Sequence, residues 1–285
     1  VDDNVSVFAN TGYVEKPPIM DNVIYYDGTV ASDPLNESFI SSEAGVNFSS
    51  DNFAVKVSAY NTDWKDRNLT KSVTTGQGDS GDTDVIFLKG IGQKHQGLEV
   101  EGSMKLNDMV RLDGAVSFGK WKFDGDADGL YTEYDGDAPI QTAYTYTLDG
   151  LYVGDQPQTA YVLGTTLTPM DGLRLQGIFK MYDKNYADWS PDSRELSGDA
   201  DRTQVWQAPG YNRLDLHASY KLPKVAGYDM TLTGHVFNAL DAVYVQDAVD
   251  NSQYNGYGDK LHLAHNAEVF LGTPRYFNLG LTVNF

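Results

Sequence analysis

Apolar and polar residues alternate with a period of two along much of the chain. The final residues show this most clearly, because every second one is apolar: Phe277, Leu279, Leu281, Val283 and Phe285. Successive side chains of a β-strand point to opposite faces, so the alternation predicts a strand with one apolar and one polar face. Segments of this kind recur about ten times, which predicts an all-β protein.

The remaining alternating segments form a clear group and a weaker group. The clear ones are residues 98–106, 110–118, 173–181, 214–220 and 230–236, and the weaker ones are residues 4–13, 39–48, 53–64 and 159–168. Charged residues repeatedly occupy the polar parity: Glu99, Glu101, Lys105, Arg111, Asp113, Arg174, Lys180, Asp215 and Lys221. If that face encloses an interior, the interior must hold water or pair these charges.

Short and long connections alternate along the chain. The short ones are residues 49–52, 107–108, 169–172 and 223–228, and the long ones are residues 15–38, 65–95, 121–158, 184–211 and 239–275. A β-sandwich has alternating strands too, but it has no reason to sort its connections in this way. Short turns on one side and long loops on the other are typical of a transmembrane β-barrel, and strands of about ten residues can cross the hydrocarbon layer.

Composition removes several other classes of protein. The 285 residues include 21 basic and 40 acidic ones, a net charge of −19, which argues against nucleic acid as a partner. The absence of cysteine excludes disulfides, thiolate zinc sites and cysteine nucleophiles. No apolar run is long enough for a membrane-spanning helix. The first residues lack the features of a signal peptide, so we expect a mature chain or a piece of a longer one.

Aromatic residues lie near several expected strand ends: Tyr13, Trp64, Trp121, Tyr182 and Tyr220. Rings with one apolar and one polar side are enriched where a barrel meets the membrane interface. We therefore expect these five residues in an interfacial belt, although ordinary core or surface positions would also suit them.

The last quarter of the chain carries three recognisable segments. One begins Tyr211-Asn212-Arg213-Leu214-Asp215, the next runs Val236-Phe237-Asn238-Ala239-Leu240-Asp241-Ala242-Val243-Tyr244, and the third runs from Gly272-Thr273-Pro274-Arg275 to the terminal Phe285. In this order they resemble the carboxyl end of a TonB-dependent outer-membrane receptor. Residues 59–67 are also similar to a strand from the middle of the barrel of that family.

This resemblance implies an antiparallel transmembrane β-barrel, with about ten strands present as part of a larger barrel of about 22 strands around a plugged lumen. Residues 1–285 would be the carboxyl-terminal barrel portion, with the plug domain and earlier strands absent. The function implied is import of a scarce nutrient across the bacterial outer membrane, without enzymatic chemistry. The nutrient would be a metal chelate, cobalamin, a glycan or a peptide.

The resemblance also implies the partners of the chain. They are the remainder of the receptor, meaning the plug and the other barrel strands, together with TonB acting through the plug, the lipid bilayer and a surface lipoprotein. Two alternatives stay open. The chain could be a complete small barrel that serves as an adhesin or surface hydrolase, or a secreted calcium-binding β-sandwich. Sequence upstream of Val1 and the need for detergent would distinguish them.

The longest expected loop contains a pattern of acids that suits calcium. Asp124, Asp126 and Asp128 alternate ahead of Gly129, and an acid stands at the twelfth position. Calcium prefers many oxygen ligands, so the predicted metal ligands are Asp124, Asp126, Asp128, Leu130 through its carbonyl, Thr132 and Asp135. The alternative is a solvated acidic loop, and a calcium ion is the one cofactor that the sequence suggests.

Two weaker patterns involve histidine. His262, His265 and Glu268 are spaced three apart and could bind a transition metal if they were helical, but they lie among β-favouring residues. Asp215 and His217 share the polar face of one expected strand. No serine or second acid is placed to complete a catalytic set with them, so we expect a hydrogen-bonded pair in the lumen and no catalytic residues.

Overall fold

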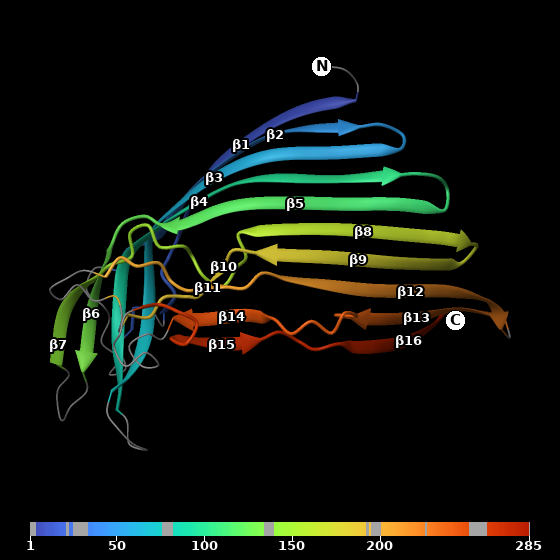
Figure 1. Ribbon diagram of the computed structural model, residues 1–285. Helices are drawn as coiled ribbons and strands as arrows, with labels where there is room; N and C mark the ends of the chain where they lie inside the picture. The colour runs from blue at the N-terminus through green and yellow to red at the C-terminus, as the bar shows by residue number, and fades with distance from the viewer. Residues whose placement is uncertain are drawn as a thin grey trace.

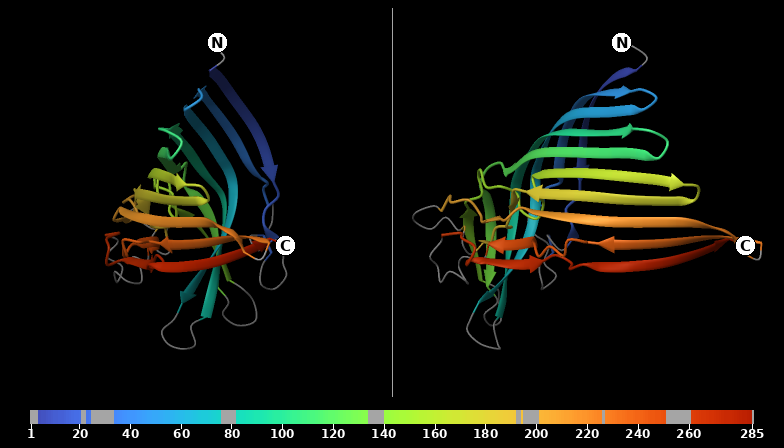
Figure 2. Two further views of the ribbon diagram at one scale, coloured as in Figure 1. Left: turned by 90° about the vertical axis from the view of Figure 1, so that its right-hand side faces the viewer. Right: turned by 45° about the vertical axis from the view of Figure 1, so that its right-hand side comes forward.

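The computed structural model describes residues 4–20, 23–24, 34–75, 82–133, 140–191, 194, 201–225, 227–250 and 261–284. Its main feature is one antiparallel sheet that curves into an open trough (Figures 1 and 2). The predicted all-β antiparallel fold is confirmed. No helix within the described ranges has the length and apolar character needed to cross a membrane.

Ten of the strands follow one another across this sheet, and each pairs with its neighbours. In order they are β1 (Val5–Lys16), β2 (Glu37–Ser49), β3 (Phe53–Thr75), β4 (Asp82–Lys105), β5 (Val110–Phe123), β8 (Thr159–Met170), β9 (Leu173–Asp183), β12 (Tyr211–Val225), β13 (Tyr228–Phe237) and β16 (Tyr276–Asn284). They coincide with the ten alternating segments of the sequence. β1 and β16 form the two edges of the sheet and do not pair, so the barrel is partial and unclosed in the residues described.

The short turns and the long connections lie at opposite ends of the strands (Figure 1). The long connections contain six further strands: β6 (Ala127–Glu133), β7 (Ile140–Tyr146), β10 (Asn185–Tyr186), β11 (Gln207–Ala208), β14 (Val245–Asp250) and β15 (Ala267–Leu271). These strands gather beyond one end of the main sheet, where β6 adds to β4 and β7 adds to β6. We call the end with the long connections the loop end and the end with the short turns the turn end.

The connection expected at residues 65–95 is mostly strand, which corrects the sequence-based boundary. β3 and β4 have 23 and 24 residues and pair with each other far beyond the rest of the sheet. Irregular pairing around Arg67, beside a left-handed backbone at Asp66, marks where the regular alternation stops. The extension remains β-structure because it contains β-favouring residues and because β6 pairs with the extended part of β4.

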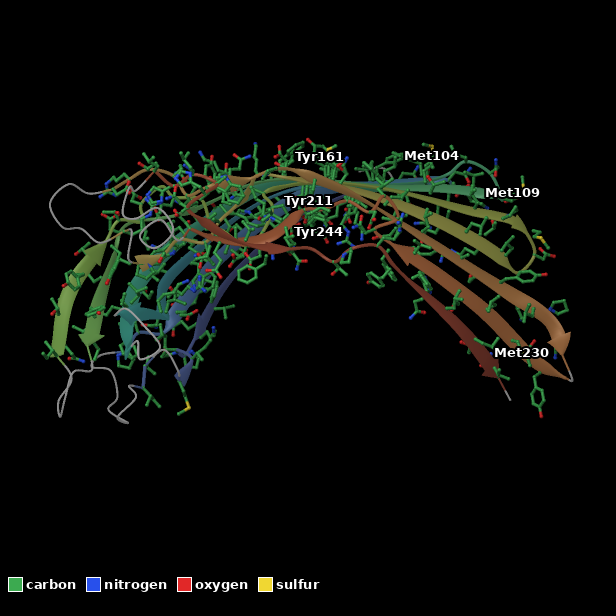
Figure 3. The ribbon with its side chains drawn as sticks, turned by 60° about the horizontal axis from the view of Figure 1, so that its bottom comes forward. Met104, Met109, Tyr161, Tyr211, Met230 and Tyr244 are labelled. Carbon is green, nitrogen blue, oxygen red and sulfur yellow. The ribbon has the colours of Figure 1, made fainter. Side chains whose placement is uncertain are left out.

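The two faces of the curved sheet differ as the alternation predicts. Large apolar side chains on the convex face are exposed, for example Phe277 at 78% and Leu279 at 77%. Figure 3 shows Tyr161 and Met104 on the convex side of the arch and Tyr244 beneath it. The described strands form no second sheet against the convex face, so the architecture is not a two-sheet sandwich. An apolar convex face of this kind suits contact with lipid.

The main cluster of buried apolar side chains lies at the loop end rather than along the barrel wall. Its members come from the extension of β4, from the end of β5 and from the long connections: Ile86, Leu88, Ile91, Phe123, Ala127, Tyr146, Leu148, Leu151, Tyr186, Trp189 and Val205. The loops thus have their own packed core, which holds them in place above the wall.

Candidate functional site in the barrel wall and loops

A pocket of about 600 Å³ lies against the concave face, toward the loop end of strands β2 to β5. Its lining alternates with the convex-face positions of the same strands: Phe39, Glu43, Lys56, Tyr60, Thr62, Trp64, His95, Glu99 and Trp121. We call this set the aromatic pocket. It combines ring faces with two carboxylates and one ammonium group, so it can pack against flat apolar surfaces and also bond polar groups.

Ring contacts hold the aromatic pocket together. The indole N–H of Trp121 donates to the Tyr60 hydroxyl at 2.8 Å, and the His95 ring stacks on Trp121 with centroids 5.4 Å apart. Gly97 lies beside Tyr60, and an added Cβ at that position would overlap the phenol ring. The glycine therefore makes room for Tyr60 to lie against the wall.

Trp64 occupies the other side of the aromatic pocket. Its ring lies 4.8 Å from that of Phe39, and the Arg67 guanidinium lies 4.7 Å from its ring centroid. Its indole N–H is buried and has no acceptor among the described residues. A buried donor without a partner is unfavourable, so a ligand oxygen reaching this group would gain a hydrogen bond at little cost.

The predicted interfacial belt is corrected for three of its five members. Trp64 and Trp121 line the aromatic pocket, and Tyr182 stands opposite Tyr211 on the concave face. Only Tyr13 and Tyr220 share the parity of the apolar convex residues. The five aromatic residues do lie near strand ends. Which face of the sheet each ring points to depends on its parity relative to the neighbouring strands.

Several charges on the concave face are paired, as an enclosed polar interior favours. Asp215 is buried and accepts hydrogen bonds from Lys180 Nζ at 2.9 Å and from the backbone N–H of Asn238 at 2.9 Å. Lys56 lies between Glu43 and Glu101 at 3.6 Å and 3.8 Å, in a more exposed position. The first pairing is tight and desolvated, whereas the second is loose and screened by water.

The three carboxyl-terminal motif segments meet at one corner of the wall. The ring of Tyr244 stacks on Tyr211 at 4.3 Å, and Arg213 donates to the Tyr244 hydroxyl at 3.1 Å. Gly272 lies against the same ring, where an added Cβ would overlap it. Asn238 is fully buried and has a left-handed backbone conformation. It closes the turn after β13 through two hydrogen bonds with the backbone of Ala242. The motif therefore builds the turn that joins the wall to the last loop.

A buried ionic network ties two of the long connections together. Arg194 and Asp250 are both 0% exposed, and Arg194 Nη2 lies 3.4 Å from Asp250 Oδ2. His262 contacts Asp250 through Nδ1 and Asp201 through Nε2, the latter at 2.6 Å. Arg194 also donates to the carbonyl oxygen of Thr203 at 2.6 Å. We call these residues the loop clamp: Arg194, Asp201, Asp250 and His262.

The loop clamp perturbs the titration of its own members. Burial disfavours the charged imidazole of His262, but hydrogen bonds to Asp250 and Asp201 outweigh this effect and raise its pKa. Burial likewise disfavours the Asp201 carboxylate, yet the hydrogen bond from His262 contributes to a net lowering of its pKa. The charged forms are thus the ones that the folded loops favour.

The residues predicted to bind calcium are drawn out along a strand. Asp128, Leu130 and Thr132 belong to β6, which corrects the expectation that this segment is a loop. Thr132 is buried in the β4–β6 pairing, and Asp128 accepts a hydrogen bond from Thr145. Asp124 lies just before β6, and Asp135 lies outside the described residues.

Asp126 already has partners of its own. Arg202 donates to both of its carboxylate oxygens, at 2.9 Å and 2.7 Å, and this bidentate pair lowers the pKa of Asp126. The backbone N–H groups of Leu148 and Asp149 also bond it. The described residues include no group of three or more histidine, aspartate or glutamate side chains arranged to hold a metal ion. Calcium binding therefore stays a prediction.

The two histidine patterns have different outcomes. His262 belongs to the loop clamp and is not brought together with His265 and Glu268 as a metal group within the described chain. Asp215 and His217 share the concave face, as expected, but do not bond each other. Asp215 binds Lys180, and His217 contacts His235 on the next strand, which corrects the predicted pair.

A family model described as "TonB dependent receptor-like, beta-barrel" matches residues 1–239. The chain belongs to the TonB-dependent receptor family. Receptors of this family lie in the bacterial outer membrane, which agrees with the apolar convex face of the sheet. No curated protein sequence matches the chain.

Solved structures of the family share this fold. The copper transporter OprC superposes with a TM-score of 0.62 at 15% identity, over 99% of this chain and 37% of its own. A mutant of the ferric enterobactin receptor PfeA from Pseudomonas aeruginosa gives 0.61 at 15% identity, over 99% and 38%. The ferric preacinetobactin receptor BauA from Acinetobacter baumannii gives 0.58 at 19% identity, over 100% and 35%. The chain thus spans about a third of the length of these structures.

Sequence reasoning missed the aromatic pocket and the loop clamp. The pocket could have been found from parity, because Lys56, Tyr60 and Trp64 fall on the polar side of one alternating segment. Nothing in the sequence indicates the loop clamp, since its members come from separate connections and meet only through the packing of the loops.

Proposed function

We propose that this chain is the wall and outer mouth of a receptor that imports a scarce nutrient across the outer membrane. The observation that carries the proposal is a wall with an apolar convex face and a paired, polar concave face, in a chain that belongs to the TonB-dependent receptors. In this proposal a plug contributed by the rest of the receptor lies against the concave face, and TonB supplies energy through that plug. No step of the proposed transport is a chemical reaction of this chain.

The aromatic pocket supports a proposal about the ligand class. Rings from Tyr60, Trp64 and Trp121 favour flat or apolar faces, such as those of aromatic chelators, corrin rings and sugars. Glu43 and Glu99 beside them disfavour a strongly anionic ligand. We therefore propose a neutral or cationic metal chelate, cobalamin, a glycan or an aromatic peptide. Solved relatives include a copper transporter and receptors for ferric chelates, which favours the metal chelate.

Uptake in whole cells tests the transport proposal. The complete receptor would be produced in a strain that lacks its own receptors, and cells would receive one labelled member of each ligand class. We expect one class to accumulate, and only in cells with a functional TonB. Accumulation that is equal with and without TonB, or accumulation of no class, would overturn the proposal.

The aromatic pocket is tested by ligand binding to the same receptor in detergent. Trp64→Ala removes a ring and the unpartnered indole donor, so we expect about a tenfold loss of affinity for the transported ligand. Tyr161→Ala is the matched control, because Tyr161 lies on the convex face (Figure 3). Equal affinities for both variants would remove the pocket from the ligand site.

A further inference from the structure

Two histidines face each other across neighbouring strands in the middle of the wall. His217 of β12 stands directly opposite His235 of β13, and their Nδ1 atoms lie 2.9 Å apart. Both side chains share the concave face with Asp215 and are half-buried. Their ring centroids are 5.1 Å apart. The two nitrogens therefore converge on one point of the inner surface.

Polar side chains continue the same row across the sheet. Gln176 of β9 stands opposite His217, and Asn278 of β16 stands opposite His235. The ring of Phe237 contacts both imidazoles, with centroids 5.5 Å and 6.0 Å away. The row thus holds two nitrogen ligands between two amides, with an aromatic ring that limits their rotation.

Neither imidazole is hydrogen-bonded to a carboxylate in the described chain. The nearest acid along β12, Asp215, is bound by Lys180 and by the backbone of Asn238. In a histidine pair without such a partner, an N–H of one ring donates to an unprotonated nitrogen of the other ring. Unprotonated imidazole nitrogens are also the atoms that bind metal ions.

We propose that His217 and His235 form a binding site for a divalent transition metal on the inner wall. Imidazole nitrogens bind such ions at about 2.0–2.1 Å, and two ligands at a right angle are then about 2.9 Å apart. The spacing of the pair matches this without any movement of the strands. Water or the amide oxygens of the flanking row can fill the remaining positions.

The chemistry of the site favours copper among these ions. Affinity of nitrogen ligands rises from manganese to copper and falls again at zinc, and imidazole suits copper, nickel and zinc. Two protein ligands leave several positions open, so the bound ion exchanges readily and accepts ligands from solution. The site does not depend on the proposed transport function, because it needs only the register of β12 with β13.

Copper titration of the complete receptor in detergent tests the site. The receptor is first treated with a chelator and then titrated with Cu²⁺, and electron spin echo spectroscopy counts the imidazoles bound to the ion. We expect two imidazoles on one tightly bound Cu²⁺ in the wild type. We expect one imidazole and at least about a tenfold weaker affinity in His217→Gln and in His235→Gln.

A matched histidine variant on another part of the chain serves as the control. His265→Gln alters the last loop, away from β12 and β13. It should keep the affinity within about twofold, with heat-dependent gel mobility showing that the variant is folded. Equal affinity of the wild type and the His217→Gln/His235→Gln double variant would overturn the proposal. A spectrum of the wild type without two imidazoles would overturn it without any variant.

Discussion

His262 Nε2 and Asp201 Oδ2 lie 2.6 Å apart although 61 residues separate them in the chain. The other ring nitrogen of His262 contacts Asp250, and Arg194 lies beside both. The last long connection is therefore joined to the one before it by an ionic network within the loops. The aromatic pocket lies at the same end of the wall. How firmly the loop clamp holds these loops in place therefore affects access to the pocket.

The loop clamp should loosen as the pH rises. The pKa of His262 is raised above its ordinary value of 6.5, so its contribution is complete below that pH and is lost as the pH rises through the raised pKa. The pKa of Asp201 is lowered from 3.8, so its contribution is lost only as the pH falls below that value. We expect faster hydrogen exchange, corrected for intrinsic rates, at residues 261–266 at pH 8.5 than at pH 6.

His262→Gln is the variant that isolates this effect. It removes the titrating group, so exchange at residues 261–266 should be fast at both pH values. His265→Gln, in the same turn, should retain the wild-type difference. The loop clamp is not the pH-sensitive element if His262→Gln keeps that difference too.

A second contact that should weaken as the pH rises involves Asp155. Burial, a hydrogen bond with Asp247 and the nearby Asp188 carboxylate raise the pKa of Asp155 to about 7, while Lys71 opposes them. The folded state favours the protonated acid, so this contribution declines as the pH rises from about 4 through 7.

Asp155→Asn keeps a neutral donor and tolerates the left-handed backbone at φ 68. We expect the variant to raise the denaturation temperature at pH 8 and to leave it nearly unchanged at pH 4. Asp155→Ala is the control, because it lacks the donor. A lower denaturation temperature for Asp155→Asn at pH 8 would show that ionisation of Asp155 does not weaken the folded state.

Gly272 should not tolerate a side chain. A Cβ there would overlap the Tyr244 ring, which is stacked on Tyr211 and cannot move without breaking that contact. We expect Gly272→Ala to cost about 1–3 kcal/mol, as overpacking usually does. Gly12→Ala is the matched control, because no atom lies within 4 Å of its added Cβ. Urea unfolding in lipid vesicles measures both variants, and equal midpoints would disprove the steric argument.

Two lysines of the concave face, Lys180 and Lys56, should differ in their contribution to stability. Lys180→Met deprives the buried Asp215 of its closest cation, although Arg213 at 3.6 Å and the Asn238 N–H remain. We expect a loss of about 1–3 kcal/mol in urea unfolding. Lys56→Met breaks two longer and more exposed pairs, and we expect a loss below about 1 kcal/mol. The reverse order would show that burial does not govern these pairs.

If the acidic segment binds calcium as predicted, the affinity should depend on Arg202. A calcium ion would have to replace this guanidinium at Asp126, so we expect Arg202→Gln to increase calcium affinity and Asp126→Ala to abolish it. Isothermal titration of the complete receptor and both variants measures the effect. Arg213→Gln serves as a control, since Arg213 lies in the wall. Identical calcium isotherms for wild type and Asp126→Ala would end the calcium prediction.

The sequence by itself determined the wall. Alternation with a period of two marks a strand directly, because side chains of a strand must point to opposite faces, and ten such segments became ten neighbouring strands. The sorting of connections into short and long also follows from local turn residues. The motif around Asn238 was readable for the same reason, since its bonds to Ala242 span only four residues.

Only the tertiary structure decided what the side chains do. Trp64 and Trp121 are interfacial residues by type, but the register between strands turns them toward the pocket. Asp126 matches a calcium pattern, but Arg202 reaches it from 76 residues away. His217 meets His235 because β12 pairs with β13 in one particular register. Local patterns encode which way a strand alternates, whereas the partners of a charge or ring depend on which distant segments pack beside it.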